Sequence, residues 1–200
     1  MDAPEVAGRY AFAAVVADLT DLLDALEIST AIWVGYSMGG RVALGAGLLA
    51  ADRVAGLVLE SASPGIADRV EREARRLSDA RIADRLVEGD MESFVAEWES
   101  KPLFASQGSL PRPILEAQRR QRLCNRPAAL AACLRGLGTG MQPSFWDGLS
   151  HLKMPALLIV GEDDEKYLRL NRQMAEEMPD ASLAVVTGAG HNVHLERPRE

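Results

Sequence analysis

The chain has 200 residues, 48% of them hydrophobic and 26% charged, which suits a globular protein with a sizeable core. Its net charge of −7 and pI near 5.1 argue against nucleic acid as a partner of the whole chain. Its apolar runs are far shorter than a membrane span, and the N-terminus does not have the pattern of a signal peptide. Two cysteines without a disulfide or metal-ligand pattern suit a reducing cytoplasm, and no cofactor, metal or membrane partner is expected.

Helical and strand-like segments alternate along the chain. Amphipathic periodicity predicts helices, whereas short apolar, β-branched runs predict buried strands. The predicted elements are a helix over 11–26, a strand over 30–36, a helix over 39–51, and strands over 54–61, 155–161 and 182–188, with a further helix that stops before Pro179. This alternation predicts an α/β fold with a parallel sheet.

A long helical segment interrupts that alternation. About 95 residues separate the second strand from the third, although a crossover between parallel strands needs only a dozen or so. Residues 66–146 are therefore predicted to form a helical cap insertion over one end of the sheet. Residues 1–65 and 147–200 would form the core.

Gly35-x-Ser37-x-Gly39 lies between a predicted strand and a predicted helix, the context of a nucleophile elbow. We expect glycine at 35 and 39 because side chains there would collide in so tight a turn. The turn would lift the Ser37 hydroxyl above the sheet edge, with the amide of Met38 facing a developing oxyanion. The alternative is a glycine-rich turn without chemistry.

A serine needs a histidine to take its proton, and the chain has three. His191 follows the last predicted strand in a glycine loop that could bring its ring over the sheet edge. His151 is expected in a solvated loop. His194 is expected to face a helix or make a structural hydrogen bond.

The histidine in turn needs a carboxylate to fix its tautomer. Asp163 and Asp164 both follow the third predicted strand, and the glycine turn at Gly161 favours Asp164; the alternative is a solvated acidic loop. The order Ser37, Asp164, His191 is the one expected for the α/β-hydrolase fold.

The segment from Lys101 to Trp146 contains seven basic residues and one acidic residue, a net charge of +6. If this segment roofs the serine, it would attract a substrate with several carboxylates, which suit arginine forks. The alternatives are a solvated basic surface or salt bridges to the acidic core.

Several stretches together resemble one family, the 2-succinyl-6-hydroxy-2,4-cyclohexadiene-1-carboxylate synthases. These α/β-hydrolase-fold lyases act in menaquinone and phylloquinone biosynthesis, and the resemblance covers nearly the whole chain. The stretches that carry it are "GYSMGGRVAL", "ESASPGIADRVERE", "FVAEWESKPLFASQ", "QRRQRLCN", "LRGLGTGMQPSFW", "GEDDEKY" and "GAGHNVHLERP".

The resemblance implies elimination of pyruvate from 2-succinyl-5-enolpyruvyl-6-hydroxy-3-cyclohexene-1-carboxylate, a small anionic substrate. It implies that Ser37 is the base that removes a ring proton, with His191 as its partner and Asp164 as the orienting carboxylate. The substrate-binding residues that it implies are Tyr36, Met38, Arg41, Arg75, Trp98, Arg122, with Arg119 as second choice, and Lys166.

The sequence departs from the family pattern at its N-terminus. The family begins with several strands and a His-Gly-Phe-like loop that supplies a second oxyanion amide, and nothing like these occurs here. We therefore expect a fragment, or a gene with a misplaced start, in which N-terminal strands are missing. An apolar sheet edge and face would then be exposed.

Two other functions remain open from the sequence. One is a serine esterase or carbon–carbon bond hydrolase of the same fold, which the basic segment disfavours. The other is a chain without activity that binds a partner through the exposed sheet, which the complete Ser-Asp-His set disfavours.

Overall fold

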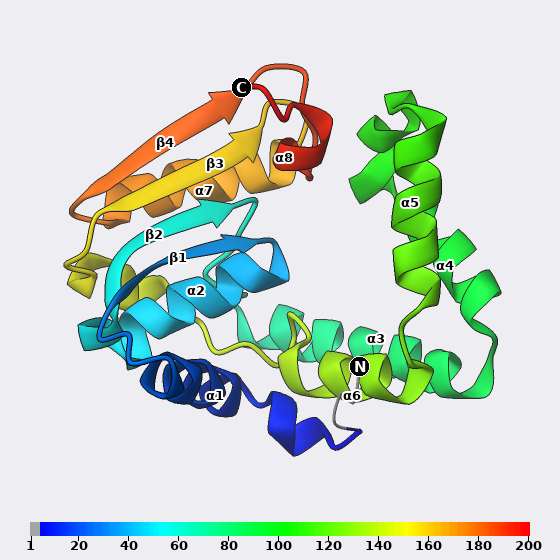
Figure 1. Cartoon of the computed structure of the whole chain (residues 1–200), viewed down its shortest axis with the longest axis horizontal. Helices are drawn as coiled ribbons and strands as arrows, with labels where there is room; N and C mark the ends of the chain where they lie inside the picture. The colour runs from blue at the N-terminus through cyan, green and yellow to red at the C-terminus, as the bar shows by residue number, and fades with distance from the viewer. Residues whose placement is uncertain (1–4) are drawn as a thin grey trace. The chain divides into compact units, whose positions relative to one another are not determined.

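The computed structural model describes residues 5–200. Contacts between residues divide the chain into two compact units, which we call the sheet unit and the helical unit (Figure 1). The sheet unit comprises Phe12–Gly65 and Ser144–Glu200. The helical unit comprises the residues up to Ala11 together with Ile66–Pro143.

The sheet unit is built on four parallel strands in the order β1-β2-β3-β4. The strands are β1 (Ala31–Tyr36), β2 (Val54–Glu60), β3 (Ala156–Gly161) and β4 (Ala181–Val186). All four coincide with predicted strands to within two residues, and the predicted parallel sheet and α/β fold are confirmed. Because the strands are parallel, their carboxyl ends lie along one edge of the sheet.

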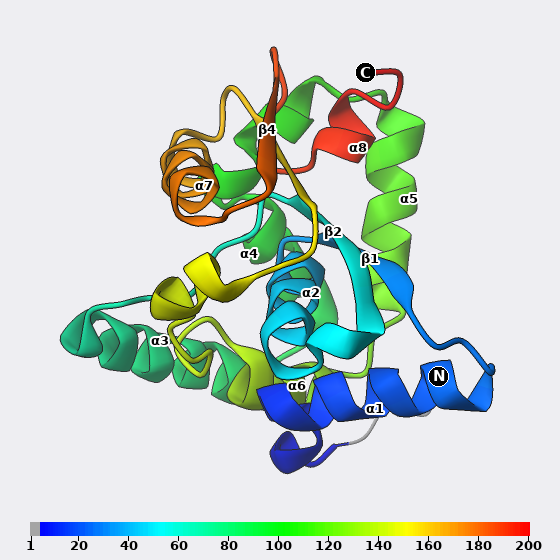
Figure 2. The same cartoon turned by 90° about the vertical axis from the view of Figure 1, so that its left-hand side faces the viewer.

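Two helices of the sheet unit, α2 (Met38–Leu49) and α7 (Glu165–Glu177), cover one face of the sheet. The other elements of the unit are α1 (Phe12–Ala25), which packs against α2, the short helix α8 (Val193–Glu196), and the 3-10 helices η2 (Ala51–Arg53) and η4 (Trp146–His151). Figure 2 shows α2 and α7 on the same side of the strands, where α2 contacts β1 and β2, and α7 contacts β3 and β4. Leu59 and Leu158 of the sheet, Leu44 of α2 and Met174 of α7 are all fully buried.

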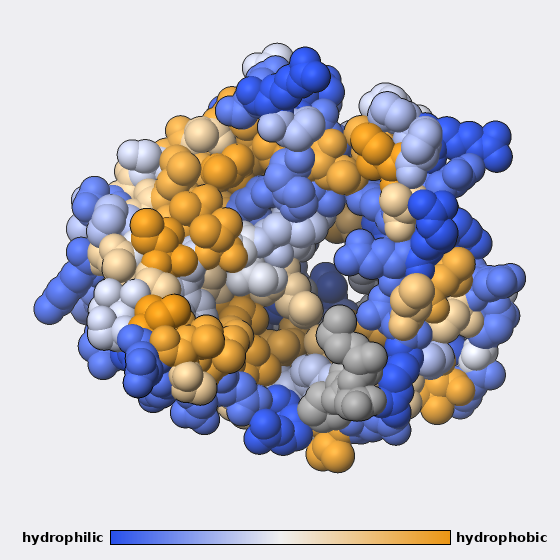
Figure 3. Space-filling view, viewed as in Figure 1, coloured by the Kyte–Doolittle hydropathy of each residue, from blue (hydrophilic) through white to orange (hydrophobic). Residues whose placement is uncertain are grey.

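The prediction that all strands are buried is wrong for β1. Ile32 and Val34 are 65% and 75% exposed, and Gly35 is the one buried residue of β1. Gly35 packs against Gly39 and Gly40 of α2, so Ile32 and Val34, which alternate with it along the strand, lie on the opposite face of the sheet. Figure 3 shows hydrophobic side chains gathered over this face of the sheet. Most residues of the two middle strands, β2 and β3, are buried, although Ala55 and Leu157 are exposed, and β4 has no buried residue.

The helical unit has a small apolar core of its own. Its elements are η1 (Ala7–Tyr10), α3 (Arg69–Glu88), α4 (Met91–Glu99), η3 (Pro102–Ser109), α5 (Arg112–Leu123) and α6 (Pro127–Leu137). Ala83 and Leu86 of α3 pack with Ala131 of α6, and Asp68 and Asp90 cap the N-termini of α3 and α4. The 3-10 helix η1 packs against α6, a contact that no sequence motif had signalled. Within residues 5–200, no helix has both the length and the hydropathy of a membrane span.

Candidate active site

Ser37 occupies a sharp turn between β1 and α2. Its φ of 50° lies in the left-handed region, which costs energy for a residue with a Cβ. The turn is held by two backbone hydrogen bonds, from Ser37 N to Glu60 O at 2.8 Å and from Arg41 N to Ser37 O at 3.0 Å. A strained serine held between a strand and a helix matches the predicted elbow.

The glycine requirement in this turn differs from the prediction. A Cβ at Gly35 would lie 2.3 Å from the carbonyl carbon and oxygen of Gly39, whereas a Cβ at Gly39 would meet nothing within 4 Å. At Gly40, a Cβ would lie 2.7 Å from the Cβ of Ala62. The expectation that position 39 must be glycine for steric reasons is therefore wrong. The crowded positions are 35 and 40, because the strand end and β2 press against the first turn of α2.

We expect Gly35→Ala to destabilise the protein by about 3 kcal/mol, since the atoms in the way are backbone atoms that cannot rotate aside. Gly39→Ala is the matched control, because it adds the same methyl group in the same turn. It should be neutral or stabilising by up to about 1 kcal/mol, since alanine favours a helix over glycine. Urea unfolding of both variants measures the difference. Equal losses in the two variants would contradict this account of the turn.

The structure brings Ser37, His191 and Asp164 together. His191 Nε2 lies 2.9 Å from Ser37 Oγ, and His191 Nδ1 lies 2.6 Å from Asp164 Oδ2. His191 is 1% exposed and Asp164 7% exposed, so this pair is held away from bulk water. With Nδ1–H donating to the carboxylate, Nε2 is left to accept the serine proton.

Two loops that follow neighbouring strands form this arrangement. Asp164 precedes α7 after β3, and His191 lies between β4 and α8. Gly161, the last residue of β3, packs tightly against the loop that carries His191. A Cβ added at Gly161 would lie 2.2 Å from the carbonyl oxygens of Ala189 and Gly190. Asp163 donates its amide to Ala189 O at 2.9 Å, and its side chain is exposed. Of the two candidate carboxylates, Asp164 is the one that reaches the imidazole.

Two tyrosine rings flank His191. The ring of Tyr167 lies 4.5 Å from the imidazole and that of Tyr36 lies 5.4 Å away, centroid to centroid. Burial raises the pKa of the Tyr36 phenol, and the nearby charges of Glu60, Glu196 and Asp164 raise that pKa further. Tyr36 is therefore a protonated hydrogen-bond donor at neutral pH.

Sequence reasoning missed two buried carboxylates beside this site, Glu60 at the end of β2 and Glu196 in α8. Glu60 bonds His194 Nδ1 at 2.8 Å, which is the kind of structural hydrogen bond expected for His194. A carboxylate that ends an apolar strand was a possible signal for Glu60. His151 is exposed, as expected, but lies in η4.

The other predicted residues of the sheet unit have differing environments. Met38 is 45% exposed at the start of α2, whereas Arg41, three residues later, is only 7% exposed. Lys166 is exposed, and its Nζ lies 5.9 Å from the centre of the Tyr167 ring.

Arg119 and Arg122, the two predicted binding arginines of α5, share one carboxylate. Arg119 Nη1 donates to Glu99 Oε2 at 2.8 Å and Arg122 Nη1 donates to Glu99 Oε1 at 2.9 Å. All three side chains line a cavity of about 430 Å³ within the helical unit. Gln107 also lines this cavity, and its buried amide nitrogen has no hydrogen-bond partner among residues 5–200.

Arg75 and Trp98, also predicted to bind substrate, are held by neighbours in the helical unit. Arg75 Nε donates to Asp79 Oδ1 at 2.7 Å. Trp98 stacks on Phe94 at 5.8 Å, and Lys101 Nζ lies 4.9 Å from the centre of the Trp98 ring.

The charge count over Lys101–Trp146 overstated the positive charge that is not paired with a carboxylate. Three carboxylates outside that segment pair with arginines inside it. Glu99 pairs with Arg119 and Arg122, Glu5 pairs with Arg126, and Asp84 pairs with Arg135. Arg112 pairs with Glu116 inside the segment. The arginines of this segment are thus largely matched by carboxylates that a local count cannot include.

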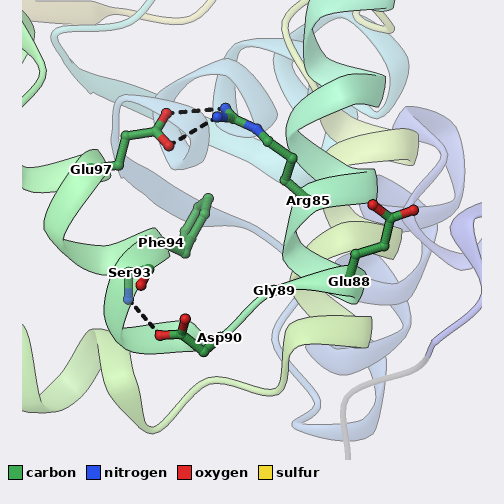
Figure 4. A pocket seen from close by; sticks show the side chains of 7 residues that line it. All are labelled: Arg85, Glu88, Gly89, Asp90, Ser93, Phe94 and Glu97. Atoms are coloured by element: carbon green, nitrogen blue, oxygen red, sulfur yellow. Dashed lines mark hydrogen bonds and ion pairs between the residues drawn. The ribbon is translucent and has the colours of Figure 1, made fainter.

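A second cavity of the helical unit lies between α3 and α4 and has a volume of about 290 Å³. Figure 4 shows Arg85 turned towards Glu97, which it holds through two bonds of 3.0 Å, while Asp90 accepts from the backbone of Ser93. Arg85 and Glu97 are thus engaged with each other, and none of the predicted site residues lines this cavity. In the described part of the chain, no group of three or more His, Cys, Asp or Glu side chains could hold a metal ion.

Comparison with known proteins gives consistent matches. The profile of the alpha/beta hydrolase family matches residues 2–200. A Salmonella enteritidis PT4 protein named 2-succinyl-6-hydroxy-2,4-cyclohexadiene-1-carboxylate synthase is 37% identical over 186 residues, 91% of this chain and 71% of that protein. A Bacillus subtilis (strain 168) protein, provisionally given the same name, is 41% identical over 198 residues, 99% of this chain and 72% of that protein. The solved structure of MenH from S. aureus matches with a TM-score of 0.91 at 37% identity, covering 94% of this chain and 71% of that one.

Proposed function

Because this chain belongs to the 2-succinyl-6-hydroxy-2,4-cyclohexadiene-1-carboxylate synthases of the alpha/beta hydrolase family, we infer that it is a lyase that eliminates pyruvate. The substrate would be 2-succinyl-5-enolpyruvyl-6-hydroxy-3-cyclohexene-1-carboxylate. The reaction belongs to the biosynthesis of menaquinone or phylloquinone.

The structures of substrate and product define what the protein must do. The substrate has a ring double bond between C3 and C4 and an enolpyruvyl oxygen on C5. The product has ring double bonds between C2 and C3 and between C4 and C5. A base must remove the C2 proton, which the succinyl ketone acidifies. The C–H electrons form the C2–C3 double bond, the former double bond moves to C4–C5, and the C5–O bond breaks. The departing enolpyruvate takes up a proton and becomes pyruvate.

Ser37 is the base in this proposal. A serine hydroxyl removes a proton only if its own proton can pass to a stronger base. The bond of 2.9 Å between Ser37 Oγ and His191 Nε2 is the observation that carries the proposal, because it places an acceptor at the serine. Asp164 supports it by holding Nδ1 at 2.6 Å, which keeps Nε2 available and stabilises the imidazolium.

Binding of the substrate is assigned from the family resemblance. Tyr36, Met38 and Arg41 adjoin Ser37 in the sequence of the elbow, and the protonated Tyr36 phenol is suited to donate a hydrogen bond to a carboxylate or ketone. Guanidinium groups bind carboxylates through paired hydrogen bonds. The remaining proposed contacts are Arg75, Trp98, Arg119, Arg122 and Lys166.

We expect Glu99→Gln to lower the KM about 3-fold or more while kcat stays unchanged, because Glu99 occupies the two arginines that would bind a substrate carboxylate. Glu116→Gln is the matched control, since it removes an equal charge from the Arg112–Glu116 pair of α5, the helix that carries Arg119 and Arg122. Steady-state kinetics of both variants measure the effect. A raised KM in Glu99→Gln alone would show that Glu99 positions the arginines and does not compete with the substrate.

The proposed activity is tested by incubating the chain with the pathway substrate and following pyruvate through a coupled dehydrogenase. Enzyme-dependent pyruvate release is the expected result. Cleavage of simple esters without pyruvate release would favour a serine esterase instead. We place the reaction in the cytoplasm, since Cys124 and Cys133 form no disulfide in the described part of the chain, which suits a reducing compartment.

A further inference from the structure

One buried carboxylate holds the backbone on both sides of His191. Glu196 Oε2 accepts from the amide of Gly190 at 2.7 Å, and Glu196 Oε1 accepts from the amide of Asn192 at 3.2 Å. The two oxygens of one planar group thus engage the residues immediately before and after the imidazole. Glu196 is 7% exposed, and among residues 5–200 its side-chain hydrogen bonds go to these backbone amides.

The local sequence explains how Glu196 reaches this position. Asn192 caps the short helix α8 by accepting from Leu195 N at 3.2 Å, and Glu196 N donates to Asn192 O at 3.0 Å. This single turn reverses the chain, so that the side chain of its last residue returns beneath the loop from which the helix begins. The loop and the carboxylate therefore form one closed structure.

The buried carboxylate of Glu196 needs both of these hydrogen bonds. A buried carboxylate is costly unless it is hydrogen-bonded, and no cationic side chain pairs with Glu196 in the described part of the chain. Hydrogen bonds to an ionised acceptor are roughly twice as strong as neutral ones. Opening the loop at either amide would leave a buried charge incompletely satisfied, so the backbone of 190–192 is held in one conformation.

We propose that Glu196 is a positioning residue that sets the imidazole of His191 between Ser37 and Asp164. The inference rests on the proposed role of His191 as the proton acceptor of Ser37. Glu196 touches neither of those reacting groups through its own hydrogen bonds and acts through the main chain of the loop. Displacement of a reacting group by about 1 Å can cost 100-fold in rate, so small movements of this loop are sufficient to matter.

The test compares Glu196→Gln with Glu162→Gln in the full chain. Glutamine keeps the volume of Glu196, but its NH2 group would face one of the two amide donors. Glu162 is the matched control, because its Oε2 accepts from Gly188 N at 3.2 Å in the same loop, away from the two amides that flank His191. Glu162 is exposed, so its loss should be tolerated.

The first measurement is the rate at which a fluorophosphonate labels Ser37, a reaction in which the Oγ–P bond forms, fluoride leaves and His191 takes the serine proton. We expect labelling to slow about 10-fold or more in Glu196→Gln and to stay within 2-fold in Glu162→Gln. Labelling does not need the pathway substrate. A failure of pyruvate release with this pattern intact would therefore overturn the proposed function and leave the role of Glu196 standing.

The second measurement is the proton NMR signal of the His191 Nδ1–H that donates to Asp164. It should weaken through faster exchange with water in a Glu196→Gln protein that remains folded by circular dichroism, whereas general destabilisation would not single out this proton. If Glu196→Gln does not fold, Glu196→Asp, which keeps the charge but cannot span both amides, is measured in its place. Unchanged labelling and an unchanged signal in a folded variant would overturn the inference.

Discussion

Ser37→Ala should lower the rate of pyruvate release by about 10⁴-fold or more while leaving the protein folded. The hydroxyl is the group that would take the ring proton, and nothing else at the elbow replaces it once Oγ is absent. His191 Nε2 lies 2.9 Å from that oxygen and would lose the group with which it exchanges a proton. The measurement is kcat from coupled pyruvate detection, with circular dichroism to verify folding.

Ser182→Ala serves as the control for this change. Ser182 is exposed on β4, so removal of its hydroxyl should leave kcat unaltered. Retention of more than a tenth of the activity in Ser37→Ala would rule out the serine as the base. The basic group would then have to be sought elsewhere in the molecule.

Asp164→Asn should reduce kcat by about 10³- to 10⁴-fold, through the tautomer of His191. The carboxylate accepts from Nδ1–H at 2.6 Å and so leaves Nε2 unprotonated towards Ser37. An amide can present its NH2 group to Nδ1 instead. The imidazole would then carry its proton on Nε2, where it cannot accept the proton of serine.

Asp163→Asn provides the matched comparison, because it makes the same chemical change one residue earlier. The side chain of Asp163 is exposed and, among residues 5–200, makes no hydrogen bond to His191, whereas its backbone amide donates to Ala189 O. Steady-state kinetics should therefore show near-normal turnover in Asp163→Asn. A larger loss in Asp163→Asn than in Asp164→Asn would reverse the assignment of the two carboxylates.

The positions of the strands and of the three central side chains could be predicted because the signals are local. Each apolar run between turn residues formed the expected strand, and parallel strands place their carboxyl ends at one sheet edge. The loops after β1, β3 and β4 carry Ser37, Asp164 and His191 to that edge. Order in the chain and position after a strand were sufficient to bring the three residues together.

Burial and steric contacts could not be predicted from local sequence signals in the same way. Ile32 and Val34 have the residue types of a buried strand, but their exposure depends on what packs on the face of the sheet away from α2. Gly39 belongs to the elbow motif, yet the crowded neighbour is Gly40, which meets Ala62 after β2. Both outcomes depend on contacts between segments distant in the chain.

The sequence by itself determined the succession of strands and helices along the chain, the family, and the residues that converge at the sheet edge. Each of these depends on local sequence patterns and on the geometry of parallel strands. Only the tertiary structure decided the partners of the charged groups. It placed Glu99 between Arg119 and Arg122 and Glu196 beneath His191. Electrostatic and hydrogen-bonding partners are chosen by distance in space, which separation in the sequence does not measure.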